Sequence, residues 1–239
     1  MSLPANPIRR LWYRFVTGVF ASISAVLISV YQATLDFTIE GDDELRLLAA
    51  RKKNFIVATW HTFVYAGIFL LHSRGLYIYS DHPRTRSYEE SWTHWFREIG
   101  IKTLASLGFD VLDASLGKQS AGVVNFIKLI KGGRPALVAP DGPHGPIYRA
   151  KPGVIYMARK ADSVVLPVGF GFSRRVVLPN WDDFALPLPF SRVAMVIGEP
   201  IEPGRELTDE DMERLTAEME ATLDRLCFRA NELLDGKGS

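Results

Sequence analysis

The chain has 239 residues, 47% of them hydrophobic, which suits one α/β domain with a substantial core or at most two small domains. The 28 basic and 27 acidic residues leave a formal charge of +1, which argues against a general nucleic-acid binder. The single cysteine, Cys227, excludes an internal disulfide, and we expect it to be a small hydrophobic residue of a C-terminal helix rather than a nucleophile.

The first predicted element is an apolar helix over 15–35, a stretch that carries no formal charge. Arg9, Arg10, Trp12 and Arg14 precede it, and basic and aromatic residues beside an apolar run are typical of a membrane-seated segment. Its serine, threonine and glutamine residues make it a weak spanning helix, and no clear small-residue cleavage site ends it as in a signal peptide. We favour an uncleaved helix that lies in or dips into the cytoplasmic face of the inner membrane, with a helix packed on the domain as the alternative.

The rest of the chain alternates short apolar strands with helices, which predicts a mostly parallel α/β sheet flanked by helices. We therefore divide the chain into the N-terminal helix, 1–35, and one α/β domain, 36–239. The last helix has Thr208 as its N-cap and Asp211 at the capping-box position. The other elements are strand 34–40, helix 42–51, strand 54–60, helix 62–71, strand 76–79, helix 88–107, strand 109–112, helix 119–131, strand 134–139, helix 154–160, strand 164–170, and strands 175–178 and 192–197 around a proline-rich loop.

The turn that follows strand 134–139 carries the most chemical information. It reads Pro140-Asp141-Gly142-Pro143-His144-Gly145-Pro146. Open α/β sheets bind ligands at the carboxyl ends of their strands, and prolines and glycines fix a backbone that a substrate can approach closely. Arg149 and Lys151 bring positive charge to the same loop, which suits an anionic or phosphate-bearing substrate. The alternative is an ordinary strand-to-helix connection.

His61 follows strand 54–60 and is therefore expected at the same edge of the sheet, where a neutral histidine can act as a general base. The sequence has no Gly-x-Ser-x-Gly elbow, no Walker A sequence and no Gly-x-Gly-x-x-Gly, since Gly169-Phe170-Gly171 lacks the third glycine. No metal-ligand spacing is found either, so we expect no metal.

Several motifs then occur in a familiar order: the histidine at a strand end, Gly108-Phe109, the Pro140–Pro146 turn, and Leu166-Pro167-Val168. This pattern resembles the glycerolipid (lysophospholipid) acyltransferase superfamily, and in particular a bacterial branch, long catalogued as a domain of unknown function, with a Pro-Asp-Gly-Pro-Arg-Gly-Pro core. Further similar pieces are Lys151-Pro152-Gly153-Val154, Asn180-Trp181-Asp182, Pro189-Phe190-Ser191 and Gly198-Glu199-Pro200, so that the resemblance runs from about Phe37 to Ile201.

The resemblance implies His61 as the general base, and the turn residues Asp141, Gly142, Pro143, His144 and Gly145 as the substrate site. The chain departs from the superfamily in two places. The aspartate five positions after the histidine is replaced by Ala66, and the substrate-binding arginine by Asp113. Asp81, after the next strand, is the candidate partner for His61, with a turn or capping role as the alternative. Lys118, Arg149 and Lys151 are the candidate cations.

The implied activity is transfer of a fatty acyl group from acyl-CoA or acyl carrier protein to a hydroxyl of a lysophospholipid or related lipid. No cofactor beyond that co-substrate is expected, and the partners are the membrane surface and its lipids. Because both departures remove charged groups, a catalytically degenerate lipid-binding protein is the main alternative, followed by a hydrolase. The apolar loop 184–190 is expected to cover the core, or otherwise to contact the bilayer or an acyl chain.

Overall fold

A computed structural model of the protein describes residues 7–50, 54–71, 77–80, 92–107, 110–113, 119–133, 135–142, 144–179, 181–204 and 206–236. Within these residues, seven strands form one sheet in the order β1-β9-β6-β2-β5-β3-β4. Neighbouring strands run parallel except β6 and β9, which are antiparallel, so the predicted mostly parallel α/β fold is confirmed. The strands are β1 (Asp36–Glu40), β2 (Phe55–Ala58), β3 (Tyr77–Ser80), β4 (Asp110–Asp113), β5 (Ala136–Val138), β6 (Val164–Phe172) and β9 (Arg192–Ile197), with β7 (Arg175–Val177) and β8 (Ala185–Pro187) as a separate antiparallel pair.

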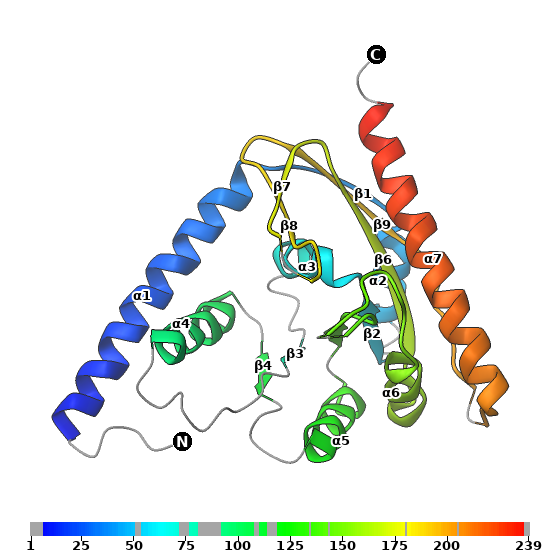
Figure 1. The fold of residues 1–239 in the computed structure, drawn as a ribbon, viewed down its shortest axis with the longest axis horizontal. Coiled ribbons are helices and arrows are strands. Elements are labelled where there is room, and N and C mark those ends of the chain that lie inside the picture. Colours follow the sequence, from blue (N-terminus) through cyan, green and yellow to red (C-terminus); the bar gives the residue numbers. More distant parts are fainter. Residues whose placement is uncertain are drawn as a thin grey trace.

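Helices pack around the sheet, and in Figure 1 α1 and α4 lie on one side of the molecule and α7 on the other. The first helix begins at Pro7, earlier than predicted, and therefore includes the basic residues ahead of the apolar run. Strand β8 lies inside the segment predicted as a loop, which corrects that prediction. The helices are α1 (Pro7–Ala33), α2 (Asp42–Ala50), the 3-10 turn η1 (His61–Phe63), α3 (Val64–Leu71), α4 (Trp92–Ser106), α5 (Gln119–Lys131), α6 (Gly153–Ala161) and α7 (Asp209–Asp235).

The core lies around β2 and β6, whose residues are buried along their whole lengths. Such continuous burial is expected of central strands covered on both faces. Two glycines on β6 let α7 approach the sheet closely. A Cβ on Gly169 would lie 2.4 Å from the carbonyl carbon of Leu226, and one on Gly171 would lie 2.9 Å from that of Ala230. The Gly169-Phe170-Gly171 sequence therefore serves the packing of a helix against a strand.

Helix α7 begins as the sequence predicts. The Thr208 side chain accepts a hydrogen bond from the Asp211 N–H at 3.1 Å, and the Thr208 N–H donates to the Asp211 carboxylate at 3.2 Å. The capping box is confirmed, and it satisfies two backbone N–H groups that helix geometry leaves without a partner.

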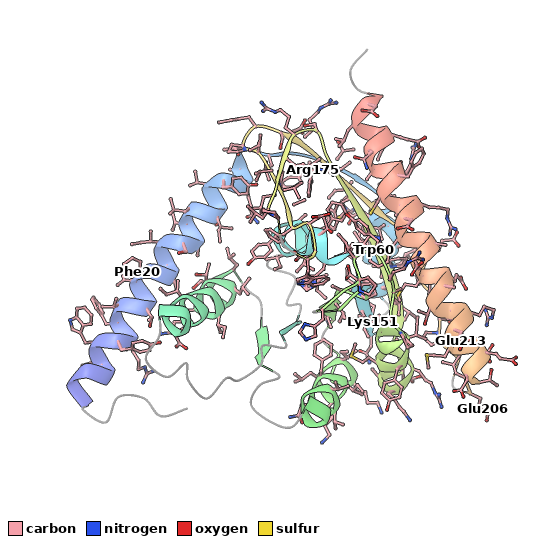
Figure 2. All side chains as sticks on the ribbon, in the orientation of Figure 1. Phe20, Trp60, Lys151, Arg175, Glu206 and Glu213 are labelled. Atoms are coloured by element: carbon pink, nitrogen blue, oxygen red, sulfur yellow. The ribbon has the colours of Figure 1, made fainter. Side chains whose placement is uncertain are left out.

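Helix α1 has two contrasting faces. Tyr13, Thr17, Ala21 and Ala25, each four residues apart, are buried, and α1 packs on α4. The Lys102 ammonium of α4 donates to the Thr17 hydroxyl at 2.5 Å. The other face exposes large apolar side chains: Leu11, Trp12, Phe15, Val19, Phe20, Ile23, Val26, Leu27 and Val30. By length and composition α1 is one helix that could cross a membrane, with a mean hydropathy of 1.7 over its most apolar part, and Figure 2 marks Phe20 on it at the edge of the molecule.

Candidate functional site

His61 and Asp141 meet at the carboxyl edge of the sheet. Strands β2 and β5 are parallel neighbours, with Ala58 paired to Val138, and each site residue follows three positions after its own member of that pair. Equal offsets on adjacent parallel strands place the two residues side by side. The His61 N–H accordingly donates to the two Asp141 carboxylate oxygens at 3.1 and 3.4 Å. The two strand-end residues that the sequence singled out are thus in direct contact.

Asp141 is fully buried, and its carboxylate is held by backbone donors. The N–H group of His61 hydrogen-bonds to it, and the N–H groups of Tyr148 and Asp141 itself stabilise its charge. Burial and, to a smaller extent, the negative charge of Asp182 nevertheless raise the pKa of Asp141 to about 6, although the backbone hydrogen bonds lower it in part. The Asp141 carboxylate therefore fixes the main chain at His61, but burying its negative charge is unfavourable for the stability of the fold.

The His61 ring is half-buried against a second aromatic residue. Its centroid lies 4.9 Å from that of Trp181 in an edge-to-face arrangement, with an interplanar angle of 73°. Burial lowers the pKa of His61, while the charge of Asp182 raises it. The imidazole is therefore neutral near pH 7, as a general base must be. Its Nδ1 is buried and has no hydrogen-bond partner among the described residues.

The turn after β5 uses glycine where other residues would be strained. Gly142 and Gly145 have φ values of +70° and +65°. A Cβ on Gly145 would lie 2.9 Å from Cε3 of Trp181, so the turn packs directly under the ring that contacts His61. A Cβ on Gly142 would lie 3.2 Å from the Nζ of Lys151, so the Lys151 ammonium lies over the turn.

Asp182 is the residue that sequence reasoning did not select for the site. Its side chain is buried, its Oδ1 has no partner within the part of the chain described, and its carbonyl oxygen accepts a hydrogen bond of 2.6 Å from the Thr62 hydroxyl. Thr62 follows His61 directly, so Asp182 is anchored beside the histidine although 120 positions separate the bonded residues. The signal for it in the sequence was the Asn180-Trp181-Asp182 piece of the family resemblance.

The other predicted site residues lie in varied settings. Arg149 forms an ion pair of 2.8 Å with Glu220 of α7, and His144 is exposed. Asp81, Pro143 and Lys118 lie outside the described residues. Ala66, at the position where the sequence resemblance would place an aspartate, is buried on α3.

Two further observations concern reactive and metal-binding side chains. Burial raises the pKa of the Cys227 thiol to about 11, which agrees with a packing role rather than a nucleophilic one. Across the residues that the structure describes, no group of three or more histidine, cysteine, aspartate or glutamate side chains is placed to hold a metal ion.

Comparison with known proteins gave three findings. No protein-family model matches the chain. An uncharacterized protein of Rickettsia prowazekii (strain Madrid E) is 29% identical over 99 residues, which is 41% of this chain and 45% of that protein's length. Among solved structures, the chain is similar to the 1-acyl-sn-glycerophosphate acyltransferase PlsC from Thermotoga maritima, with a TM-score of 0.50, 15% identity, and coverage of 94% of this chain and 84% of that one. The chain therefore has a fold similar to that of a lysophosphatidic acid acyltransferase over nearly its whole length.

Proposed function

We propose that this protein is a membrane-associated acyltransferase. It moves a fatty acyl group from acyl-CoA or acyl carrier protein to a hydroxyl of a lysophospholipid or related lipid. One observation carries the proposal: at the carboxyl edge of a sheet of the PlsC type, a half-buried neutral histidine, His61, meets two buried aspartates, Asp141 and Asp182. A histidine fixed among acids favours catalysis over the binding of lipid alone.

In the reaction, His61 takes the proton of the acceptor hydroxyl while the oxygen attacks the thioester carbonyl. The new C–O bond forms as the C–S bond breaks, and the thiolate leaves with the proton that His61 held. Net charge is conserved, and the products are the ester and a free thiol. The lowered pKa of His61 keeps it ready to accept that proton at neutral pH.

The carbonyl oxygen becomes negative during the attack and requires hydrogen-bond donors. In the turn, the Gly142 N–H already donates to the Ala139 carbonyl at 3.2 Å, and the Asp141 N–H stabilises the charge of its own carboxylate. Prolines supply no N–H, so the turn's remaining backbone donors are those of His144 and Gly145. We assign these two N–H groups to the developing oxyanion or to an acceptor phosphate.

Positive charge for an anionic acceptor comes first from Lys151, whose ammonium lies over Gly142. Arg149 serves the acceptor only by exchanging its present partner, Glu220. Lys118 is a further candidate. Asp113, at the end of β4, stands where the superfamily has its arginine, so the phosphate contact differs from the usual one.

The same proposal places α1 in the plane of the cytoplasmic face of the inner membrane. A spanning α1 would draw α4 and the Lys102 ammonium into the hydrocarbon, because Lys102 bonds to Thr17 in the middle of the helix. Lying flat, α1 buries its exposed apolar face in lipid and keeps its other face on the protein. A second proposed contact with the membrane lies near the C-terminal end of α1. The Tyr31 hydroxyl of α1 donates to the Pro187 carbonyl, and Phe190, three residues further, is 78% exposed.

The test is acyl transfer by the purified protein in detergent. Radiolabelled palmitoyl-CoA and palmitoyl-acyl carrier protein are each offered with a panel of lysophospholipids and lipid alcohols. Wild type is compared with His61→Ala and with a matched histidine control, His94→Ala on α4. We expect product with wild type and the control, and none with His61→Ala. Free fatty acid as the main product would instead support the hydrolase, and bound lipid with no turnover would support the lipid-binding protein.

A further inference from the structure

The reaction proposed above requires an acidic residue beside His61. The position at which the superfamily carries that acid has an uncharged residue in this chain. The superfamily position is Ala66, which is 2% exposed on α3. A histidine that becomes protonated in a water-poor site needs a neighbouring carboxylate, which selects the tautomer and stabilises the imidazolium. That carboxylate must come from another segment of the chain.

Asp182 has the properties that such a group requires. It is 7% exposed, and its Oδ1 is buried with no hydrogen-bond partner among the described residues. Burying a carboxylate without satisfying its oxygens is strongly unfavourable, so such groups in folded proteins call for an explanation. Neither an ion pair nor a capping bond within the described chain accounts for this carboxylate.

The main chain around Asp182 is fixed next to the histidine. The Thr62 hydroxyl donates to the Asp182 carbonyl at 2.6 Å, and the ring of Trp181 packs on the ring of His61 at 4.9 Å. Gly145 packs beneath Trp181 in turn. The backbone at Asp182 is thereby fixed next to His61 by a hydrogen bond and by a ring contact. The Oδ1 of Asp182 nevertheless has no hydrogen-bond partner among the described residues.

The complementary unbonded atom is on His61. Its Nδ1 is buried and also without a partner in the described residues. Other polar groups that border the site are already engaged. The Asp141 carboxylate accepts the His61 backbone N–H, and the Thr62 hydroxyl donates to the Asp182 carbonyl. Asp224 of α7 bonds to the Trp60 Nε1 at 3.2 Å.

Resting on the proposed function, we infer that Asp182 is the positioning residue for His61: its carboxylate accepts the His61 Nδ1–H as the imidazole takes up its second proton, in the role that Ala66 leaves vacant. The pairing directs Nε2 toward the acceptor hydroxyl. Because Asp182 acts through His61 and touches no reacting atom, it positions the base rather than reacting itself. The proton passes from the acceptor to His61 and onward to the thiolate, and Asp182 stays ionised throughout.

The first test does not depend on acyl transfer. The pKa of His61 is measured by ¹H–¹⁵N NMR in wild type, Asp182→Asn and Asp183→Asn, with the resonance assigned from His61→Gln. Asp183 is the exposed neighbour of Asp182 and provides a control of identical chemistry. We expect Asp182→Asn to lower the pKa of His61 by about half a unit to one unit, and Asp183→Asn to leave it unchanged. Equal pKa values in all three proteins overturn the inference.

The second test separates positioning from folding. We expect Asp182→Asn to lower kcat by about 100-fold or more with KM changed little, and Asp182→Glu to recover part of the loss. An Asp182→Asn variant with wild-type kcat overturns the inference, as does a loss confined to KM. If wild type transfers no acyl group but the NMR difference is present, the proposed function fails and the pairing of Asp182 with His61 stands.

Discussion

Replacing Asp141 by asparagine tests whether the buried charge of Asp141 lowers the free energy of unfolding. The asparagine keeps an oxygen that can accept the His61 N–H and removes the desolvated charge. In wild type, the pKa of Asp141 rises from 3.8 in the unfolded chain to about 6 in the fold. A pKa difference of one corresponds to about 1.4 kcal/mol, so the rise at Asp141 is equivalent to about 3 kcal/mol.

The sign follows from the direction in which the pKa moves. A carboxyl group with a raised pKa favours the folded state while it is protonated, fully below pH 3.8, and this contribution is lost as the pH rises through about 6. We therefore expect wild type to lose about 2 to 3 kcal/mol of unfolding free energy between pH 4 and pH 8 through this group. Asp141→Asn has no such loss. Hydrogen bonds that the amide fails to reproduce cost the same at both pH values, so they cancel from the comparison.

The measurement is urea unfolding at pH 4 and pH 8, followed by tryptophan fluorescence, for wild type, Asp141→Asn and the exposed control Asp183→Asn. We expect the difference in stability between Asp141→Asn and wild type to change by about 2 to 3 kcal/mol in favour of asparagine at pH 8. The control should follow wild type at both pH values. Parallel pH dependence in wild type and Asp141→Asn would refute the reasoning that Asp141 is a buried carboxylate ionised at a cost.

Three further changes test the fold and the membrane surface. A Cβ at Gly169 would lie 2.4 Å from the main chain of α7, so Gly169→Ala should lower the unfolding free energy by about 1 to 3 kcal/mol, measured by thermal denaturation. In the control Gly153→Ala, a Cβ at position 153 has no atom within 4 Å, so the same measurement should show little change. Thr208→Ala removes the cap of α7 and should cost about 1 kcal/mol in urea unfolding, and an unchanged midpoint would count against the cap. Phe20→Asp on the exposed face of α1 should weaken binding to phosphatidylglycerol-containing vesicles about 10- to 100-fold in flotation assays, whereas Phe228→Asp on the exposed face of α7 should not, and equal losses would exclude α1 as the membrane contact.

Much of the fold could be predicted because the signals that encode it are local. Strands β2 and β6 are unbroken apolar runs, and the capping box of α7 is four residues long. Strand β8 could not be predicted in this way. It is a three-residue strand, Ala-Leu-Pro, in a proline-rich segment, and what makes it a strand is its pairing with β7.

The residues of the candidate site likewise differ in whether local sequence signals could place them. His61 and Asp141 end neighbouring parallel strands, so a general property of α/β sheets was enough to bring them together. Arg149 could not be placed by its nearness to the turn in sequence, because its ion pair with Glu220 forms when α7 docks. Asp182 lies in a loop with no periodic pattern, and its position depends on Thr62, Trp181 and Gly145.

These differences explain how the chain can lack the usual aspartate and still surround His61 with acids. Under the proposed function, the helix after His61 is free to bury Ala66 and the apolar residues near it, because Asp182 in the loop before β8 supplies the acid. That loop is held by a hydroxyl on the residue after His61 and by a ring that rests on the glycine turn. Asp182 and the turn after β5 are therefore joined through the packing of Trp181. A change at Gly145 that lifts this ring should disturb the position of Asp182 together with the turn. Under the proposed function, the general base, its positioning acid and the oxyanion donors therefore depend on the same packing.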